Sequence, residues 1–437
     1  MSAELKTFGR ASDRDGILRM PGLNESVRTV RLDQQSLLRH IYRTLINSGR
    51  AYAAFTETEK NLVSSLKGHG EILDPMSGYG LLTRYCSSHA VDSYCLELNL
   101  PQYFWQKLCL PESVERFVRS IDRMQEWRRR WPRRKRLVAV SDDWFTVEGL
   151  EILAQLFGLW KEAVKTSFDP KRSDLDELAI ALVLPFVGRL ACWVPGGNPT
   201  QVKNGGMCIF EGWAEDHKRY LDVLKVHLSK LKSLVGRSEN RVFYGDARTY
   251  QFPPNRFEAM VTSPPYPNRT DYRSLFAPEN FFLKWLFEEK LLRMEISEDP
   301  IIGSNFVAGR RRREPTTVAA LQFLTSIEGL PRGKNAVYHD DVYYLPYFRN
   351  YFCDLEDAYK NVSKALKPTF TGYVIVVNNT HRNTIVPVAS VIMEIWERLG
   401  FKAAVHSSSE SFHYGTKNPR ARGIRGRHTQ FIIEIKR

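Results

Sequence analysis

Apolar residues recur along this chain with two periods, one typical of helices and one typical of strands. The helical period comes first, at residues 33–46 and again from Thr56 to Gly68, where two helices are expected. Short apolar runs that stop at Gly, Pro or acidic residues follow, and they predict buried strands at 72–73, 91–97, 241–245 and 257–261. The N-terminal 68 residues are therefore interpreted as a helical lead-in to a fold that begins at the first strand.

The same alternation continues to the end of the chain. It predicts a helix at 344–366, a strand at 372–379, a helix at 387–399, and strands at 401–406 and 430–435. Residues 103–240 favour helices, and 273–340 forms a second insertion before the alternation resumes. Strands that alternate with helices predict an α/β fold with a mostly parallel, doubly wound sheet.

The strand at 257–261 stops at Ser263-Pro264-Pro265-Tyr266, where we expect the chemistry of the chain. Two successive prolines fix φ and remove two backbone donors, so neither a strand nor a helix continues through them. A hydroxyl and an aromatic ring then project from one stiff turn at the carboxyl end of a strand, where open α/β sheets bind ligands. The alternative for these four residues alone is a proline-rich turn, or a polyproline segment for a partner domain.

The first strand ends in a glycine-rich turn, Asp74-Pro75-Met76-Ser77-Gly78-Tyr79-Gly80, which precedes a helix. Glycines let the backbone approach a ligand closely, and the helix start offers free N–H groups. The turn lacks both the third glycine of a dinucleotide fingerprint and the Lys-Ser/Thr of a phosphate-binding loop. It is poorly suited to phosphates, and an ordinary strand-to-helix turn remains the alternative.

Two further acidic residues close predicted strands. Glu97 ends the second strand, where such a residue typically receives ribose hydroxyls, although a solvated charge is the simpler explanation. Asp246 follows Gly245 and precedes Ala247 at the end of the third strand, where its carboxylate can accept a hydrogen bond from an adenine amino group. The sequence therefore predicts polar groups at several neighbouring strand ends.

The charge of the chain favours a polyanionic partner. Lys and Arg number 63 against 49 Asp and Glu, a net charge of +14, which points to nucleic acid before an acidic membrane surface. Arginines gather in a run with two interleaved tryptophans at 127–136, in a loop at 310–313 and in a basic loop at 417–427. Phosphate contacts and solvated helix ends are both consistent with such runs. The candidates for nucleic-acid contact are Arg128, Arg129, Arg130, Arg133, Arg134, Arg269, Arg310, Arg311, Arg312, Arg313, Arg422 and Arg425.

The cysteines and the N-terminus predict the compartment. Six cysteines form no CxxC pair and no histidine cluster at zinc spacing accompanies them, so reduced thiols and no metal are expected. The charged N-terminus has no apolar core of a signal peptide, and the most apolar stretch, Leu178–Val194, is short and interrupted by Pro185. A soluble, cytoplasmic protein is expected.

Taken in order, these motifs resemble those of the exocyclic-amino DNA methyltransferases, which use S-adenosylmethionine to make N4-methylcytosine or N6-methyladenine. The glycine-rich turn resembles the family's D-P-F-x-G-x-G cofactor motif, with Met76 in place of Phe. Ser263-Pro264-Pro265-Tyr266 resembles the catalytic (S/N/D)-P-P-(Y/F) tetrad, and residues 268–272 resemble part of the same group. The likeness covers about 71–100, 241–272 and 344 onward, so the two insertions and the N-terminus lie outside it.

The resemblance implies a Rossmann-like class I methyltransferase fold and a role for each motif. Ser263, Pro264, Pro265 and Tyr266 would be catalytic, with the target base flipped out of its duplex. The cofactor would be held by Asp74, Pro75, Met76, Ser77, Gly78, Gly80, Glu97, Asp246 and Ala247. Serine in the tetrad favours cytosine N4 over adenine N6. The implied partners are double-stranded DNA and a cognate restriction endonuclease or defence-system subunits, in the nucleoid-associated cytoplasm of a bacterium or archaeon.

The resemblance also divides the chain. Residues 69–102, 241–272 and 344–437 would form the catalytic domain, whereas 103–240 and 273–343 are insertions expected to contact DNA. No recognition domain separates the adenine-site motif from the tetrad, so the element that reads the target sequence stays unassigned. Two alternatives remain: an enzyme that methylates guanine N2 in structured RNA, whose tetrad usually begins with Asp, and a non-enzymatic nucleic-acid-binding protein on a decayed domain.

Overall fold

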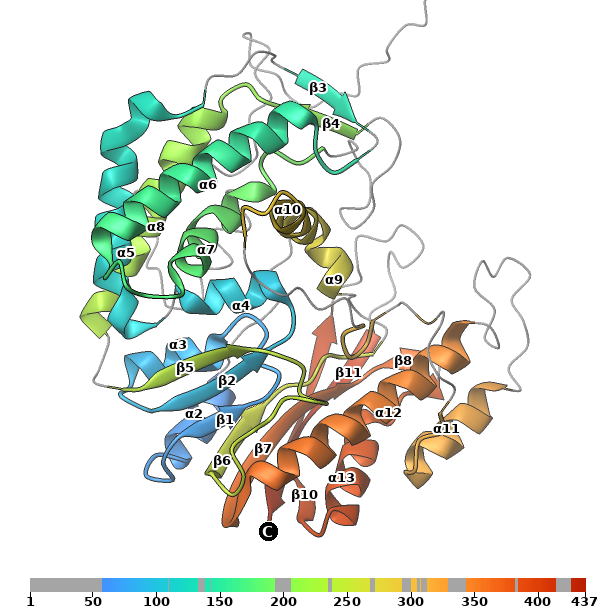
Figure 1. Ribbon diagram of the computed structural model, residues 1–437. Helices are drawn as coiled ribbons and strands as arrows, with labels where there is room; N and C mark the ends of the chain where they lie inside the picture. The colour runs from blue at the N-terminus through green and yellow to red at the C-terminus, as the bar shows by residue number, and fades with distance from the viewer. Residues whose placement is uncertain are drawn as a thin grey trace, which may run out of the picture.

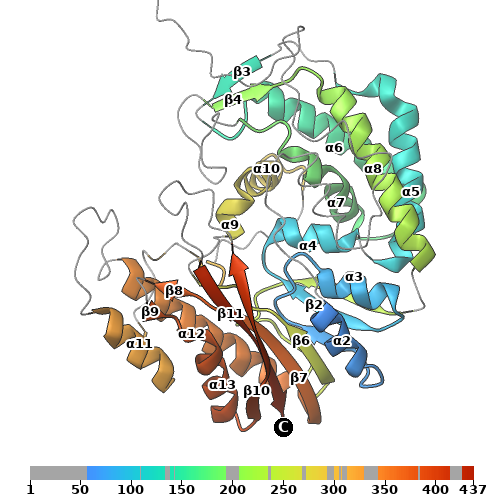
Figure 2. The same cartoon turned by 180° about the vertical axis from the view of Figure 1, so that it is seen from behind.

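The computed structural model describes residues 57–108, 110–132, 138–141, 143–192, 206–234, 238–267, 272–292, 300–304, 307, 313–328, 343–381, 384–413 and 426–437. The helix expected at 33–46 lies outside these residues. The main sheet has seven strands, and Figures 1 and 2 show it below a helical lobe.

The sheet confirms the predicted α/β class. Its strand order is β10-β11-β7-β6-β1-β2-β5, and β5, β2, β1, β6 and β7 run parallel, whereas β11 is antiparallel to both of its neighbours. In chain order these strands span Ile72–Asp74 (β1), Ser93–Glu97 (β2), Asn240–Tyr244 (β5), Phe257–Thr262 (β6), Leu366–Asn378 (β7), Lys402–His413 (β10) and Gly426–Lys436 (β11). This is a Rossmann-like, doubly wound sheet in which the strand order reverses beside β1.

Alternate residues of the central strands face opposite layers of helices. Ile72 packs with α2 (Glu57–Ser65) and α3 (Leu81–Ser88), whereas its neighbour Leu73 packs in the core of the other face. That second core holds α11 (Val318–Glu328), α12 (Leu345–Val362), η3 (Ser363–Ala365) and α13 (Val388–Arg398). Near-continuous apolar strands therefore follow from burial on both faces.

The helical lobe stands above the carboxyl ends of β1, β2 and β5 (Figure 1). It contains α4 (Leu100–Lys107), α5 (Pro111–Glu126), η1 (Trp127–Arg130), α6 (Val147–Ser167), α7 (Leu175–Val187) and α8 (Trp213–Leu234). The sequence correctly predicted mostly helices here. It missed a two-stranded antiparallel ribbon of β3 (Val138–Ser141) and β4 (Gly206–Ile209).

The second insertion is divided between two cores. After the tetrad, α9 (Tyr272–Leu275) and α10 (Ala277–Glu288) place Phe276, Phe282 and Leu286 in the core of the helical lobe. Farther along the chain, α11 packs its buried residues against α12 on the sheet. The segment between β6 and α12 thus joins the lobe at one end and the sheet at the other.

Several boundaries differ from the predicted ones. β7 begins at Leu366, six residues before the predicted start, and its pairing with β6 shifts register between Phe257 and Ala259, which accommodates Pro368 near the strand's start. A short ribbon of β8 (Thr380–His381) and β9 (Thr384–Ile385) follows β7. Of the helices described, none is both long and apolar enough to cross a membrane.

Candidate active site

The predicted motifs meet at one edge of the sheet, where parallel strands end side by side. Asp74 pairs with Cys95 in the register of β1 and β2, and Glu97 pairs with Tyr244 in the register of β2 and β5. On the other side of β1, Leu73 pairs with Met260 of β6. The glycine-rich turn after β1 therefore lies between the end of β2 and the tetrad after β6, at the edge where such sheets bind ligands.

Asp74 connects the glycine-rich turn to the tetrad. Its buried carboxylate accepts a hydrogen bond from the Thr262 hydroxyl at 2.8 Å and one from the Met76 amide at 3.3 Å. Thr262 is the last residue of β6 and directly precedes Ser263. Burial raises the pKa of Asp74 to about 7, although these two hydrogen bonds oppose the rise.

The turn requires glycine at two positions. Gly78 and Gly80 have φ of +54° and +70°, in the left-handed region that glycine enters without penalty. A Cβ on Gly80 would also lie 2.4 Å from Cγ of Gln106 on α4, so any other residue there would force Gln106 to shift. Gln106 donates to the Gly78 carbonyl at 2.8 Å, and the Ser77 amide donates to the Leu96 carbonyl at 3.0 Å. The helical lobe and β2 together fix the shape of the turn.

Glu97 is built into the same turn. One carboxylate oxygen accepts from the Gly78 amide and the other from the Asn99 amide, both at 2.6 Å. Burial raises the pKa of Glu97 to about 8, and the backbone hydrogen bonds from Asn99 and Gly78 partly offset it. Each oxygen retains a second lone pair, so the carboxylate can accept a ligand hydroxyl while it supports the turn.

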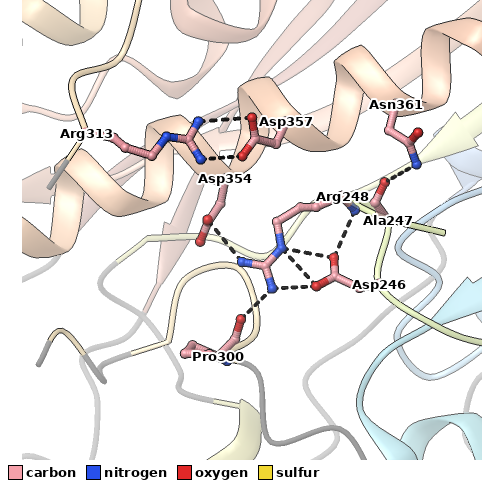
Figure 3. Close-up of polar contacts among 8 residues, drawn as sticks. All are labelled: Asp246, Ala247, Arg248, Pro300, Arg313, Asp354, Asp357 and Asn361. Carbon is pink, nitrogen blue, oxygen red and sulfur yellow. Dashed lines mark hydrogen bonds and ion pairs between the residues drawn. The ribbon is translucent and has the colours of Figure 1, made fainter. Parts of the chain in front are cut away.

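Asp246 lies after β5 and is held by an arginine (Figure 3). The guanidinium of Arg248 donates through Nε to both carboxylate oxygens of Asp246, at 3.0 and 2.9 Å. The backbone amide of Arg248 donates to Oδ1 of Asp246 at 2.9 Å. Ala247 is buried, and its carbonyl accepts from the Asn361 side chain of α12 at 3.1 Å. The predicted adenine corner is therefore rigidly attached to α12.

The tetrad forms the stiff turn that its prolines predict. The Ser263 hydroxyl lies 2.8 Å from the Tyr266 hydroxyl, and Ser263 is exposed. The Pro265 carbonyl accepts from the Tyr351 hydroxyl of α12 at 2.9 Å, and the Pro267 carbonyl accepts from the Asn379 amide. Among the described residues, none donates to the carbonyl of Pro264. The Pro264 carbonyl is thus an acceptor of the turn that no described group has taken, and the Ser263 oxygen can also accept when its own hydroxyl donates to Tyr266.

The arginine candidates divide into three groups. Arg128 pairs with Glu215, Arg130 with Glu162, and Arg313 with Asp357, the last in a two-point contact at 2.6 and 3.0 Å (Figure 3). Arg129 is exposed. The others lie outside the described residues: Arg133, Arg134, Arg269, Arg310, Arg311, Arg312, Arg422 and Arg425.

The two tryptophans of the basic run lie in different surroundings. Trp131 is buried beside Trp213 and His217, and its indole donates to the Met124 carbonyl, so its ring cannot stack on a base. Trp127 is only partly buried and lies under the guanidinium of Arg130, 4.6 Å from ring centroid to Cζ. No group of three or more metal-ligating side chains gathers anywhere in the described ranges.

Sequence reasoning missed four residues that shape this edge: Thr262, Gln106, Arg248 and Tyr351. Thr262 and Arg248 stand within two residues of predicted site residues, so proximity was a usable signal for both. Gln106 and Tyr351 lie on helices whose polar residues carry no motif. Their roles depend on contacts that only the packed fold creates.

Comparison with known proteins adds little to this geometry. No protein-family model matches the sequence, and no curated protein matches it. A solved structure, the rRNA methyltransferase AviRa from Streptomyces viridochromogenes, aligns over 93% of this chain and 94% of its own, with 10% identity and a TM-score of 0.28. So low a score carries no argument about site or substrate, and the fold assignment rests on the strand order of the sheet.

Proposed function

We propose that this chain is an S-adenosylmethionine-dependent methyltransferase that modifies the exocyclic amino group of a flipped base in double-stranded DNA, with cytosine N4 the preferred target and adenine N6 the second. One observation carries the proposal: the hydrogen bond between Thr262 and Asp74 joins the tetrad to the glycine-rich turn at adjacent strand ends. The two turns that we propose for the methyl donor and for the target amino group thus lie side by side.

The glycine-rich turn suits this cofactor better than it suits a phosphate. Gly78 and Gly80 shape the turn, and two buried acids, Asp74 and Glu97, favour a cation and hydroxyls over an anion. S-adenosylmethionine, when bound, supplies a methyl group on a positively charged sulfur and carries two ribose hydroxyls. Glu97 would accept those hydroxyls, and the Asp246 corner would receive the adenine.

The tetrad would hold the target amino group. When the Ser263 hydroxyl donates to Tyr266, its oxygen lone pairs remain free to accept an N–H, and the Pro264 carbonyl can accept the other. Two such acceptors favour a tetrahedral nitrogen with its lone pair directed away from them. Serine is too weak a base to remove a proton unaided, so alignment supplies the acceleration. Tyr266 would stack on the flipped base.

The setting of the reaction extends the proposal. We expect that the enzyme belongs to a restriction–modification or other defence system of a bacterium or archaeon. Its partners would be a cognate endonuclease or defence subunits, and it would act at the nucleoid. The net charge of +14 supports a DNA partner, since phosphate contacts need cationic side chains. The insertions at 103–240 and 273–343 are the expected source of DNA contacts.

A transfer assay tests the proposal. The protein is incubated with methyl-labelled S-adenosylmethionine and either unmethylated duplex DNA or structured RNA, and label in each polymer is counted. Label in DNA is expected; label in RNA alone would favour the guanine-N2 alternative. Cofactor binding with no transfer to either polymer would favour the non-enzymatic alternative.

Variants of the tetrad give this assay its control. Ser263→Ala and Tyr266→Ala should abolish transfer and leave cofactor affinity nearly unchanged, because neither side chain belongs to the proposed cofactor turn. Ser363→Ala is the matched control: this serine, at the start of η3, donates to the Lys360 carbonyl of the preceding helix α12 and lies just before β7, at the opposite edge of the sheet. Loss of cofactor affinity in the tetrad variants would contradict the assignment of roles.

A further inference from the structure

Arg248 is the most heavily engaged arginine near the candidate site (Figure 3). Besides its fork on Asp246, it forms an ion pair through Nη1 with Asp354 of α12 at 3.0 Å. Its Nη2 donates to the Pro300 carbonyl at 2.7 Å. One side chain therefore joins the end of β5, helix α12 and the chain at Pro300.

These contacts are made away from water. The side chains of Arg248, Asp246 and Asp354 are 12%, 11% and 4% exposed. Burial alone lowers the pKa of Arg248, but its hydrogen bond to Asp246 and the charges of Asp354 and Asp246 outweigh burial and raise it. Because the cation is desolvated and shared by two carboxylates, removal of either side leaves a buried charge without compensation.

Pro300 begins a short segment, Pro300–Ser304, that leads from Arg248 to the tetrad; we call it the strap. Ile302 anchors the strap in the core that also contains α12, and the Ser304 amide closes a turn onto the Ile301 carbonyl at 2.9 Å. At Gly303 the Tyr347 hydroxyl donates to the carbonyl at 3.3 Å. The strap is thus fixed at its start by Arg248 and near its end by α12.

The strap lies beside the tetrad at Gly303. A Cβ on this residue would lie 3.7 Å from the Tyr266 carbonyl oxygen and 3.8 Å from the Pro265 Cβ, which is van der Waals contact. Gly303 also has a φ of +77°, so a residue with a side chain would be strained there. The Tyr266 carbonyl and the Pro265 ring are therefore close neighbours of the strap.

We propose that Arg248 is a positioning residue that couples the corner around Asp246 to the Ser263–Tyr266 turn through the strap. Its Nε fixes the Asp246 carboxylate at the corner proposed for the cofactor adenine, and its Nη2 holds the start of the strap, whose Gly303 lies beside Pro265 and Tyr266. The catalytic part of this inference rests on the proposed methyltransferase function, whereas the mechanical coupling does not.

The test compares Arg248→Met with a matched control, Arg256→Met. Arg256 also contacts a carboxylate with two nitrogens, donating to Glu71 at 2.9 and 2.6 Å, but it lies at the start of β6, on the opposite edge of the sheet. Hydrogen–deuterium exchange is followed by mass spectrometry in peptides that contain Ile301–Ser304 and Tyr266. Arg248→Met should accelerate exchange of the strap amides and Tyr266 by roughly tenfold or more, and Arg256→Met should not.

Steady-state values of KM and kcat distinguish a positioning role of Arg248 from a purely structural one. Arg248→Met should raise KM for S-adenosylmethionine and lower kcat, each by roughly tenfold, since both of its contacts are lost. Arg248→Lys keeps a cation beside Asp246 but cannot hold the strap as well, so it should restore KM more than kcat. Arg248→Lys also keeps the buried positive charge. It is therefore used in the exchange experiment if Arg248→Met does not fold.

The outcomes separate the coupling from the proposed function. Unchanged strap and Tyr266 exchange in a folded Arg248 variant overturns the coupling, whatever the activity. Accelerated exchange in a protein whose wild-type form transfers no methyl group supports the coupling and contradicts the proposed function. If Arg248→Lys changes KM and kcat as much as Arg248→Met does, the guanidinium does not have two separate roles at Asp246 and at the strap.

Discussion

The two corners of the candidate site contain acidic residues in opposite surroundings. Asp74 and Glu97, in the glycine corner, accept hydrogen bonds from a hydroxyl and from backbone amides, and no described side chain forms an ion pair with either. Asp246, in the arginine corner, lies in the fork of Arg248. The pKa is raised by burial for both acids of the glycine corner, to about 7 and about 8.

This difference indicates what each corner can bind. Acids buried without a cation are costly to ionise, and a positively charged ligand would recover part of that cost. The glycine corner is therefore suited to the cationic part of a cofactor. The arginine corner is already neutralised, so it contributes shape and a fixed acceptor. The following predictions test this division.

The largest expected effect is on cofactor affinity in Asp74→Asn. Loss of the carboxylate should weaken S-adenosylmethionine binding by roughly hundredfold, about 3 kcal/mol, because a buried charge no longer faces the cationic ligand. Titration calorimetry measures this. Asp92→Asn is the control, since Asp92 accepts the Glu239 amide at 2.6 Å near the start of β2, away from the site. Equal affinity in wild type and Asp74→Asn would contradict the charge assignment.

Gly80→Ala should be nearly as damaging, through stability. The left-handed φ and the 2.4 Å approach to Gln106 together should cost about 3 kcal/mol of unfolding free energy. Gly70→Ala separates the two causes, because Gly70 has a φ of +77° with nothing within 4 Å of its Cβ position. It should cost only about 1 kcal/mol in denaturant unfolding. Equal losses would mean that Gln106 moves freely aside.

The glycine corner should also make the free protein less stable as pH rises. The folded pKa of Asp74 and of Glu97 lies above the unfolded value, so the folded state binds more protons, and stability falls as pH rises from about 4 to about 8. Urea unfolding across this range measures this fall, and Asp74→Asn should flatten the curve. A slope unchanged by that substitution would show that Asp74 ionises normally.

The smallest expected effect concerns the tetrad. Tyr351→Phe removes the hydroxyl that donates to the Pro265 carbonyl and keeps the ring. It should lower kcat by roughly fivefold, about 1 kcal/mol, with KM for the cofactor unchanged, because the lost hydrogen bond supports the tetrad turn and involves none of the proposed cofactor residues. Steady-state assays measure both constants. A rise in cofactor KM alone would place Tyr351 with the cofactor site.

The sequence predicted those parts of the site that depend on local chemistry. Paired prolines after an apolar run and glycines after a short strand restrict the backbone by themselves, so both turns were found where the structure has them. Period-two and period-3.6 patterns likewise predicted the sheet and its covering helices.

The rest depends on partners far apart in the chain. Nothing near Arg248 indicates that Asp354 and the Pro300 carbonyl will surround it. Apolar faces do not specify their partner, which is why α10 and α11, from one insertion, could not be assigned to different cores. Glu97 was predicted only as an acceptor of ligand hydroxyls. The hydrogen bond that it accepts from the Gly78 amide depends on the packing of β1 beside β2.

Identification of the modified nucleoside tests the central claim most directly. Unmethylated duplex DNA is incubated with the protein and methyl-labelled S-adenosylmethionine, digested to nucleosides and resolved by mass spectrometry. The account predicts label in N4-methyldeoxycytidine with the wild-type chain and none with Tyr266→Ala. Label in N6-methyldeoxyadenosine would retain the mechanism and change the base. Label on a carbon atom of a base, or no labelled deoxynucleoside at all, would contradict the account.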